Sequence, residues 1–164
     1  VVTAIAVLRP TEGSNVTGTL TLRQDPTQDP PLVILTVSIE NAPPNSKHGF
    51  HLHQFGDTSS PKGLAQFDHF NPFNHTHGCP TPNPDDTPSP LAISLLHHVG
   101  DMGSIATDAR GRATASWSST QLSLVDPTHA GYIPGRGVIF HADADDCVTQ
   151  PTGASGKRLA QGVV

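Results

Sequence analysis

In three stretches of the chain, apolar residues recur at every second position and mostly polar residues lie between them. They are 16-VTGTLTL-22, 33-VILTVSI-39 and 113-ATASW-117. Successive side chains of a β-strand point to opposite faces, so each stretch presents one face suited to a core. The residues expected to face inward are Val16, Gly18, Leu20, Leu22, Val33, Leu35, Val37, Ile39, Ala113, Ala115 and Trp117. Recurring strands separated by turn signals such as 108-DARG-111 predict an antiparallel β-sandwich or barrel.

The alternation disappears in the centre of the chain. Between Gly56 and Leu91 almost no period remains, and 79-CPTPNPDDTPSP-90 carries five prolines. Long loops in compact domains are usually functional or disordered, and histidines flank this one, so we predict a functional loop. A second long loop, 142–158, lies between two expected strands.

Composition supports many short strands in one domain. The chain has 164 residues, with 15 Gly and 16 Pro, 14% charged residues and 5% aromatic residues. The formal net charge is -5 without a basic stripe, which argues against nucleic acid as a partner. No apolar run approaches the roughly 20 residues of a membrane span, so we expect no membrane insertion.

Two glycosylation sequons point to the compartment. Asn15 lies in NVT and Asn74 in NHT, and such sites are modified only in a secretory pathway. The chain begins at Val1 without an initiator Met, which is consistent with a removed signal peptide. We therefore expect an extracellular, secreted protein, with a cytoplasmic location as the alternative.

Histidine is the unusual residue, with ten in the chain. In 48-HGFHLHQFGD-57, Phe50 and Leu52 alternate with His51 and His53, so the two imidazoles should project side by side from a strand. The pattern fits a metal site, but it also fits a solvent-facing strand that happens to hold two histidines. Imidazole binds zinc, copper, iron and nickel, so the pair alone identifies no metal.

Further histidine motifs follow in order along the chain: 69-HFNPFNHTHG-78, 97-HHVGD-101 and 138-VIFHADADD-146. Together with G-F-H-x-H-x-F-G-D and the tail 152-TGASGKRLAQGVV-164, these strings resemble the copper–zinc superoxide dismutase family over nearly the whole chain. The resemblance implies an eight-stranded antiparallel Greek-key barrel or sandwich carrying a zinc loop and a channel loop.

The resemblance also implies a ligand set for each metal. Copper would be held by His51, His53, His69 and His141, and zinc by His69, His77, His98 and Asp101, with His69 bridging the two. Four nitrogens suit copper, and three imidazoles with a carboxylate suit zinc. Asp145 would link His51 to His77 and orient both rings.

The remaining histidines receive other interpretations. His75 and His97 each lie close to an implied zinc ligand and could replace it, but the motif spacing favours His77 and His98. We expect His48 to form hydrogen bonds at the start of its strand. His129 lies in a loop with proline and glycine, where we expect it to be solvated.

The implied activity is antioxidant: superoxide is converted to dioxygen and hydrogen peroxide by alternate reduction and reoxidation of the copper. His69 would exchange a proton, Arg158 would anchor the superoxide anion, and Thr152 would line the other side of the channel. The alternative is a non-catalytic copper-binding or carrier module of the same fold. The complete set of four copper histidines favours the enzyme.

The chain departs from the family at its cysteines. Lys62 and Gln161 occupy the positions of the family's usual disulfide. The cysteines present are Cys79, two residues after His77, and Cys147, two residues after Asp145. Because Asp145 is expected to reach His77, we predict a Cys79–Cys147 disulfide, the alternative being two separate thiols.

Other departures concern guidance of the substrate and assembly. Pro151 stands where a steering lysine is expected, and the chain stops at Val164, short of residues that commonly complete the family's dimer contact. These differences put superoxide steering and a homodimer in doubt, but not copper binding.

Overall fold

The computed structural model describes residues 1–80 and 97–164, so most of the proline-rich run 79–90 lies outside the described residues. The elements are β1 (Val2–Pro10), β2 (Thr17–Gln24), β3 (Val33–Glu40), β4 (Lys47–His53), the short 3-10 helix η1 (Leu64–Gln66), β5 (Asp101–Ala106), β6 (Ala113–Ser119), β7 (Gly137–His141) and β8 (Arg158–Val163). Within this part of the chain, no helix is long and apolar enough to cross a membrane.

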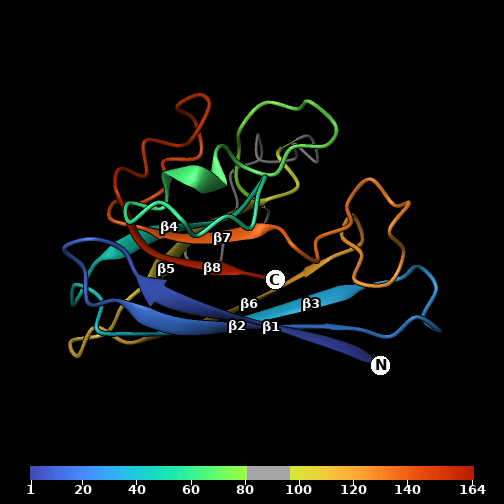
Figure 1. Cartoon of the computed structure of the whole chain (residues 1–164), viewed down its shortest axis with the longest axis horizontal. Coiled ribbons are helices and arrows are strands. Elements are labelled where there is room, and N and C mark those ends of the chain that lie inside the picture. Colours follow the sequence, from blue (N-terminus) through green and yellow to red (C-terminus); the bar gives the residue numbers. More distant parts are fainter. Residues whose placement is uncertain (81–96) are drawn as a thin grey trace, which may run out of the picture.

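The strands form an eight-stranded antiparallel sheet in the order β5-β4-β7-β8-β1-β2-β3-β6. Figure 1 shows β1, β2, β3 and β6 in one layer and β4, β5, β7 and β8 in the other. The pairings of β3 with β6 and of β4 with β7 join strands that are distant in sequence, as in a Greek key. The two end strands, β5 and β6, approach each other, so the sheet is a nearly closed barrel, as the sequence predicts.

The predicted inward-facing residues form the core of the first layer. In β3, Val33, Leu35, Val37 and Ile39 are buried, and the residues between them are exposed. The rings of Trp117 and Phe50 stack with centroids 5.6 Å apart, joining β6 to β4 across the barrel interior. Burial of this apolar face is the main stabilising contribution to the fold.

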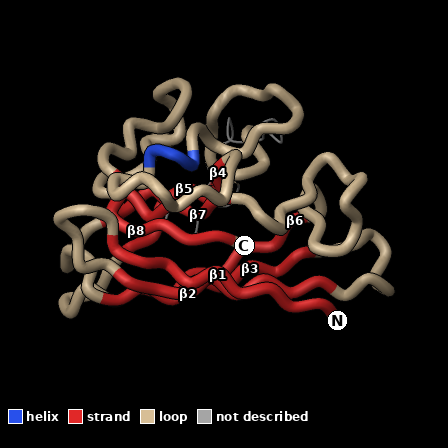
Figure 2. The backbone as a smooth tube through the Cα atoms, in the orientation of Figure 1, coloured by secondary structure: helices blue, strands red, loops and turns tan. Residues whose placement is uncertain are grey.

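The second layer is buried on both faces. All of β7 and nearly all of β4 and β5 are buried, whereas Ile34, Thr36 and Ser38 of β3 face solvent. Figure 2 shows the reason: loops gather over the outer side of this layer. Because both faces are covered, β5 and β8 lack the period-two pattern and could not be recognised from hydrophobicity alone.

Candidate metal centre

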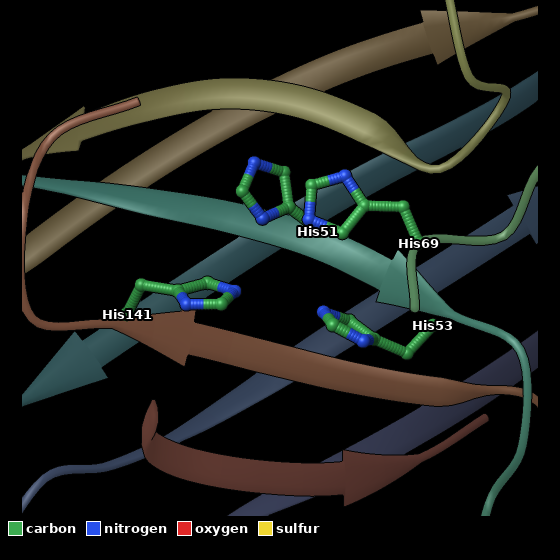
Figure 3. A group of neighbouring side chains, drawn as sticks. All are labelled: His51, His53, His69 and His141. Carbon is green, nitrogen blue, oxygen red and sulfur yellow. The ribbon is translucent and has the colours of Figure 1, made fainter. Parts of the chain in front are cut away.

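Four histidines from distant parts of the chain meet on the covered side of the second layer. His51 and His53 come from β4, His141 ends β7, and His69 lies in the loop after η1, joined to His53 by an isolated β-bridge. Figure 3 shows the four imidazoles turned toward one common space. Their ligand nitrogens lie within 4.8 Å of one another, and all four residues are buried. The structure therefore brings together every residue predicted to bind copper.

One nitrogen of each ring has no hydrogen-bond partner. These atoms are Nδ1 of His51 and Nε2 of His53, His69 and His141, all of them buried. A buried polar atom without a partner is costly, and native structures rarely contain several in one place. Four convergent nitrogen lone pairs fit a copper ion, which accepts such a ligand set.

The opposite nitrogens of three of these rings are anchored by the protein. His53 Nδ1 donates to the carbonyl oxygen of Phe67 at 2.8 Å. His51 Nε2 donates to Asp145 Oδ2 at 2.7 Å, and His141 Nδ1 lies 3.4 Å from the carbonyl oxygen of Gly156. Such anchors determine the tautomer and orientation of each ring, leaving the other nitrogen free for a metal.

Burial also keeps the rings of His53, His69 and His141 neutral. Desolvation lowers the pKa of His53 and His141 well below the usual range of histidine, and the neighbouring histidines lower it further. Desolvation lowers the pKa of His69 to about 4, despite its contact with Asp101. Neutral imidazole is the form that binds metals, so these three rings are ready for a cation at pH 7.

A second buried cluster shares His69 with the first. Its ligand atoms, from His69, His77, His98 and Asp101, lie within 4.8 Å of one another. Asp101 Oδ1 is 2.7 Å from His69 Nδ1, and Asp101 Oδ2 is 2.9 Å from His77 Nδ1. Three imidazoles and a carboxylate form an ordinary zinc ligand set. His69 thus faces one cluster with Nδ1 and the other with Nε2, as a bridging ligand would.

Asp145 links the two clusters by contacting one histidine of each. Its Oδ2 accepts from His51 Nε2 at 2.7 Å, and its Oδ1 accepts from His77 Nε2 at 2.8 Å. Burial alone would raise the pKa of Asp145, but these hydrogen bonds outweigh it and hold the pKa well below the usual range. The predicted link between His51 and His77 is therefore present, and the carboxylate is ionised at neutral pH.

The zinc-type cluster contains a further ionised carboxylate and a protonated ring. Burial would raise the pKa of Asp101, but hydrogen bonds from His69, His77 and His98 outweigh it and lower the pKa far below its usual range. Burial would lower the pKa of His77, but hydrogen bonds to Asp101 and Asp145 raise it to about 9. Without a metal, His77 therefore carries a proton at neutral pH.

The histidines outside the two clusters mostly behave as predicted. His75 Nδ1 contacts the carbonyl oxygen of His97 at 3.2 Å, and His97 Nδ1 contacts that of His98 at 2.7 Å, so neither ring belongs to a cluster. His48 is fully buried, and its Nδ1 donates to the carbonyl oxygen of His141 at 2.9 Å. His129 is only partly solvated: it is half-buried, and its Nδ1 accepts from Gly131 N at 3.0 Å.

Arg158 begins β8 and is half-buried beside the copper-type cluster. Its Nη1 and Nη2 each donate at 2.6 Å, to the carbonyl oxygens of Gly63 and Phe67. Its positive charge is close enough to lower the pKa of His53 and His141. Thr152 is half-buried in the loop before β8, and its role beside a channel stays a prediction.

The predicted disulfide is present. Cys79 and Cys147 are bonded, with an S–S distance of 2.00 Å, and they join the segment around His77 to the loop between β7 and β8. At Gln161, where the resemblance implies a cysteine in related chains, the side-chain Nε2 donates to the carbonyl oxygen of Ser60 at 3.0 Å. A hydrogen bond therefore tethers that loop to β8.

Two residues that contact the site residues could not be predicted from the sequence. Phe67 accepts hydrogen bonds from His53 and Arg158 through its carbonyl oxygen, and the side chain of Gln150 contacts the backbone of His77. Neither contact has a sequence signal, because both depend on the path of the backbone.

The sequence of the chain is similar to those of known proteins. The family model described as copper/zinc superoxide dismutase matches residues 16–164. A superoxide dismutase [Cu-Zn] of Candida glabrata is 38% identical over 169 residues, covering 99% of this chain and 97% of the relative. That of Saccharomyces cerevisiae is 36% identical over 171 residues, with the same coverage of 99% and 97%.

Two solved structures share the fold. A double mutant of a SOD-like protein from Bacillus subtilis has a TM-score of 0.76 and 27% identity, covering 97% of this chain and 95% of the other. The clock protein EA4 has a TM-score of 0.74 and 33% identity, covering 98% of this chain and 92% of the other.

Proposed function

The chain belongs to the copper/zinc superoxide dismutase family, and we propose that the two buried clusters are the sites of its two metals. Its activity is that of an oxidoreductase converting superoxide to dioxygen and hydrogen peroxide, with copper and zinc as cofactors. The proposed copper ligands are His51, His53, His69 and His141, and the proposed zinc ligands are His69, His77, His98 and Asp101. The observation that carries the proposal is the convergence of four buried ring nitrogens without hydrogen-bond partners.

Bound copper supplies a one-electron couple, which accepts an electron from one superoxide and passes it to a second. Two superoxide anions and two protons thereby give one dioxygen and one hydrogen peroxide. The protein's share of this chemistry is to bind a small anion, to exclude competing ligands and to deliver a proton.

Arg158 is the proposed binding group for the anion. Two of its guanidinium nitrogens are held by carbonyl oxygens, so the planar group is fixed in place before substrate arrives. An oriented guanidinium is a strong donor to a small oxygen anion. Because Arg158 is only half-buried, it can be reached from solvent.

His69 is the proposed proton carrier. Its Nδ1 is held against Asp101 Oδ1 at 2.7 Å, which fixes the ring, and its Nε2 faces the other histidines of the copper-type cluster. Nε2 can therefore take up a proton in one half of the cycle and release it to the peroxide product in the other. The second proton comes from solvent.

The variant His69→Val tests the proposed ligand sets. Removing a shared ring should lower the affinity for both copper and zinc, each by about tenfold or more, because each metal loses a ligand. Metal content after dialysis against a chelator measures the loss, with His129→Val as the matched control outside both clusters. Loss of only one metal would show that His69 does not bridge.

A homodimer is the proposed assembly, supported by an apolar surface beside the site. Phe55, Leu64 and Phe67 are 50%, 60% and 59% exposed, and the rings of Phe55 and Phe67 pack edge to face at 5.5 Å. Clustered aromatic side chains on a surface are typical of interfaces. Analytical ultracentrifugation should find two chains per particle in the wild type and one in Phe55→Glu; a monomeric wild type would refute the proposal.

Secretion is the proposed localisation. Asn15 and Asn74, the acceptors of the two sequons, are both exposed, and the Cys79–Cys147 disulfide suits an oxidising compartment. Protein isolated from its natural source should lose mass on treatment with an N-glycosidase. An unchanged mass would count against the secretory route.

A further inference from the structure

We infer that Gln150 is a positioning residue for the zinc ligand His77, a role that rests on the proposed zinc site. The backbone N–H of His77 donates to Gln150 Oε1 at 2.7 Å, and Gln150 Nε2 donates to the carbonyl oxygen of His77 at 3.0 Å. The side-chain amide therefore pairs with both backbone polar groups of one residue, as a neighbouring β-strand would.

His77 needs such a partner because it lies outside the barrel. The other zinc-type ligands have backbone support: His69 forms a β-bridge with His53, and Asp101 starts β5, where its N–H donates to the carbonyl oxygen of His98 at 3.0 Å. His77 follows an exposed loop segment without regular structure. Among the described residues, the hydrogen bonds to the His77 backbone come from Gln150.

The segment that carries Gln150 is itself a closed loop. Asp146 N donates to the carbonyl oxygen of Gly153 at 2.9 Å, and Gly153 N donates to that of Thr149 at 2.7 Å. Asp146 Oδ1 accepts from the backbone N–H groups of Val148 and Thr149 at 3.0 and 2.8 Å. Because these bonds fix residues 146–153, Gln150 is presented to His77 from a rigid element.

Three contacts from this one loop then converge on the His77 segment. Asp145 holds the His77 ring through Nε2, the Cys79–Cys147 bond holds the chain two residues later, and Gln150 holds the His77 backbone. Asp145 alone cannot fix the position of Nδ1, because the ring can pivot about one hydrogen bond. With the backbone also fixed, Nδ1 stays 2.9 Å from Asp101 Oδ2, inside the zinc-type cluster.

The test compares zinc affinity in Gln150→Ala, Gln150→Glu and Val148→Ala, each as the full chain with its disulfide intact. Val148 is 74% exposed in the same loop and serves as the matched control. Competition with a chromogenic chelator should show zinc affinity about tenfold weaker in Gln150→Ala, the usual cost of losing a residue that orients a ligand. Gln150→Glu keeps the acceptor for His77 N but loses the donor, so its affinity should also fall below that of the wild type. Val148→Ala should match the wild type.

A spectroscopic readout separates positioning from general weakening of the loop. Co2+ in the zinc site should give a changed visible ligand-field spectrum in Gln150→Ala, while copper affinity stays within about twofold of the wild type because the copper-type cluster is untouched. Zinc affinity and Co2+ spectrum equal to those of the wild type would overturn the inference. A wild-type protein that binds no zinc would overturn the proposed zinc ligands, and this inference with them.

Discussion

At the scale of single residues, His77 differs from the copper-site histidines in the proton that it carries before metal binds. Hydrogen bonds to Asp101 and Asp145 outweigh its burial and raise its pKa to about 9, whereas burial lowers that of His69 to about 4. Histidines of the two adjoining clusters therefore differ in protonation, because a carboxylate lies beside each ring nitrogen of His77.

Zinc binding should therefore become tighter as pH rises. Zinc must displace the proton of His77, so below a pKa of about 9 the affinity should increase about tenfold per pH unit, and level off above it. Calorimetric titration of the metal-free protein in buffers of different ionisation enthalpy should find about one proton released at pH 7.5. Release of no proton there would show that His77 is already neutral.

The resemblance of the sequence to a known family predicted the ligands and Asp145, but the other residues that hold the ligands could not be predicted. Ligands such as His51 and Asp101 lie in short ordered strings whose spacing the chemistry constrains. Gln150 acts on His77 from 73 positions away, through atoms that any glutamine has. Such a contact depends on the path of two loops, for which local sequence patterns carry no signal.

At the scale of elements, the loop between β4 and β5 holds an unusual backbone at Phe67. Its φ is +57°, a region that favours glycine, and its carbonyl oxygen accepts from both His53 and Arg158. In this conformation, one carbonyl oxygen contacts both a copper-site ring and a guanidinium. Backbone strain is thus located beside the site.

Phe67→Gly should be more stable than Phe67→Ala. Both variants lose the ring, but only glycine adopts the positive φ freely, so its free energy of unfolding should be higher by about 1 kcal/mol. Urea denaturation of both proteins measures the difference. The same pair at Phe55, whose φ is not positive, should show the opposite order; an alanine variant as stable as the glycine variant at position 67 would contradict the account.

The Cys79–Cys147 bond joins two loops across 68 residues of sequence. The double variant Cys79→Ser with Cys147→Ser should lower the free energy of unfolding by about 2–4 kcal/mol, since the unfolded chain regains the freedom that the bond removes. Guanidinium denaturation of the metal-free protein is the measurement. An unchanged denaturation midpoint would show that the disulfide stabilises the folded chain no more than the unfolded chain.

At the scale of the whole molecule, the two layers of the barrel differ in what covers their outer sides. The layer of β1, β2, β3 and β6 faces solvent on its outer side, and its strands β2, β3 and β6 could be predicted because their hydrophobic residues alternate. The layer of β4, β5, β7 and β8 is covered by loops, which bury the histidines, and its strands β5 and β8 lack a period-two pattern. Hydrophobic periodicity is therefore less informative for the layer that carries the site, although the placement of His51 and His53 on one strand could be predicted.

The proposed activity is tested most directly by metal analysis and a superoxide decay assay on the same sample of purified protein. The expected result is one copper and one zinc per chain, and acceleration of superoxide decay in proportion to the copper bound. Bound copper without acceleration would contradict it, and would identify the protein as a copper-binding module of the same fold.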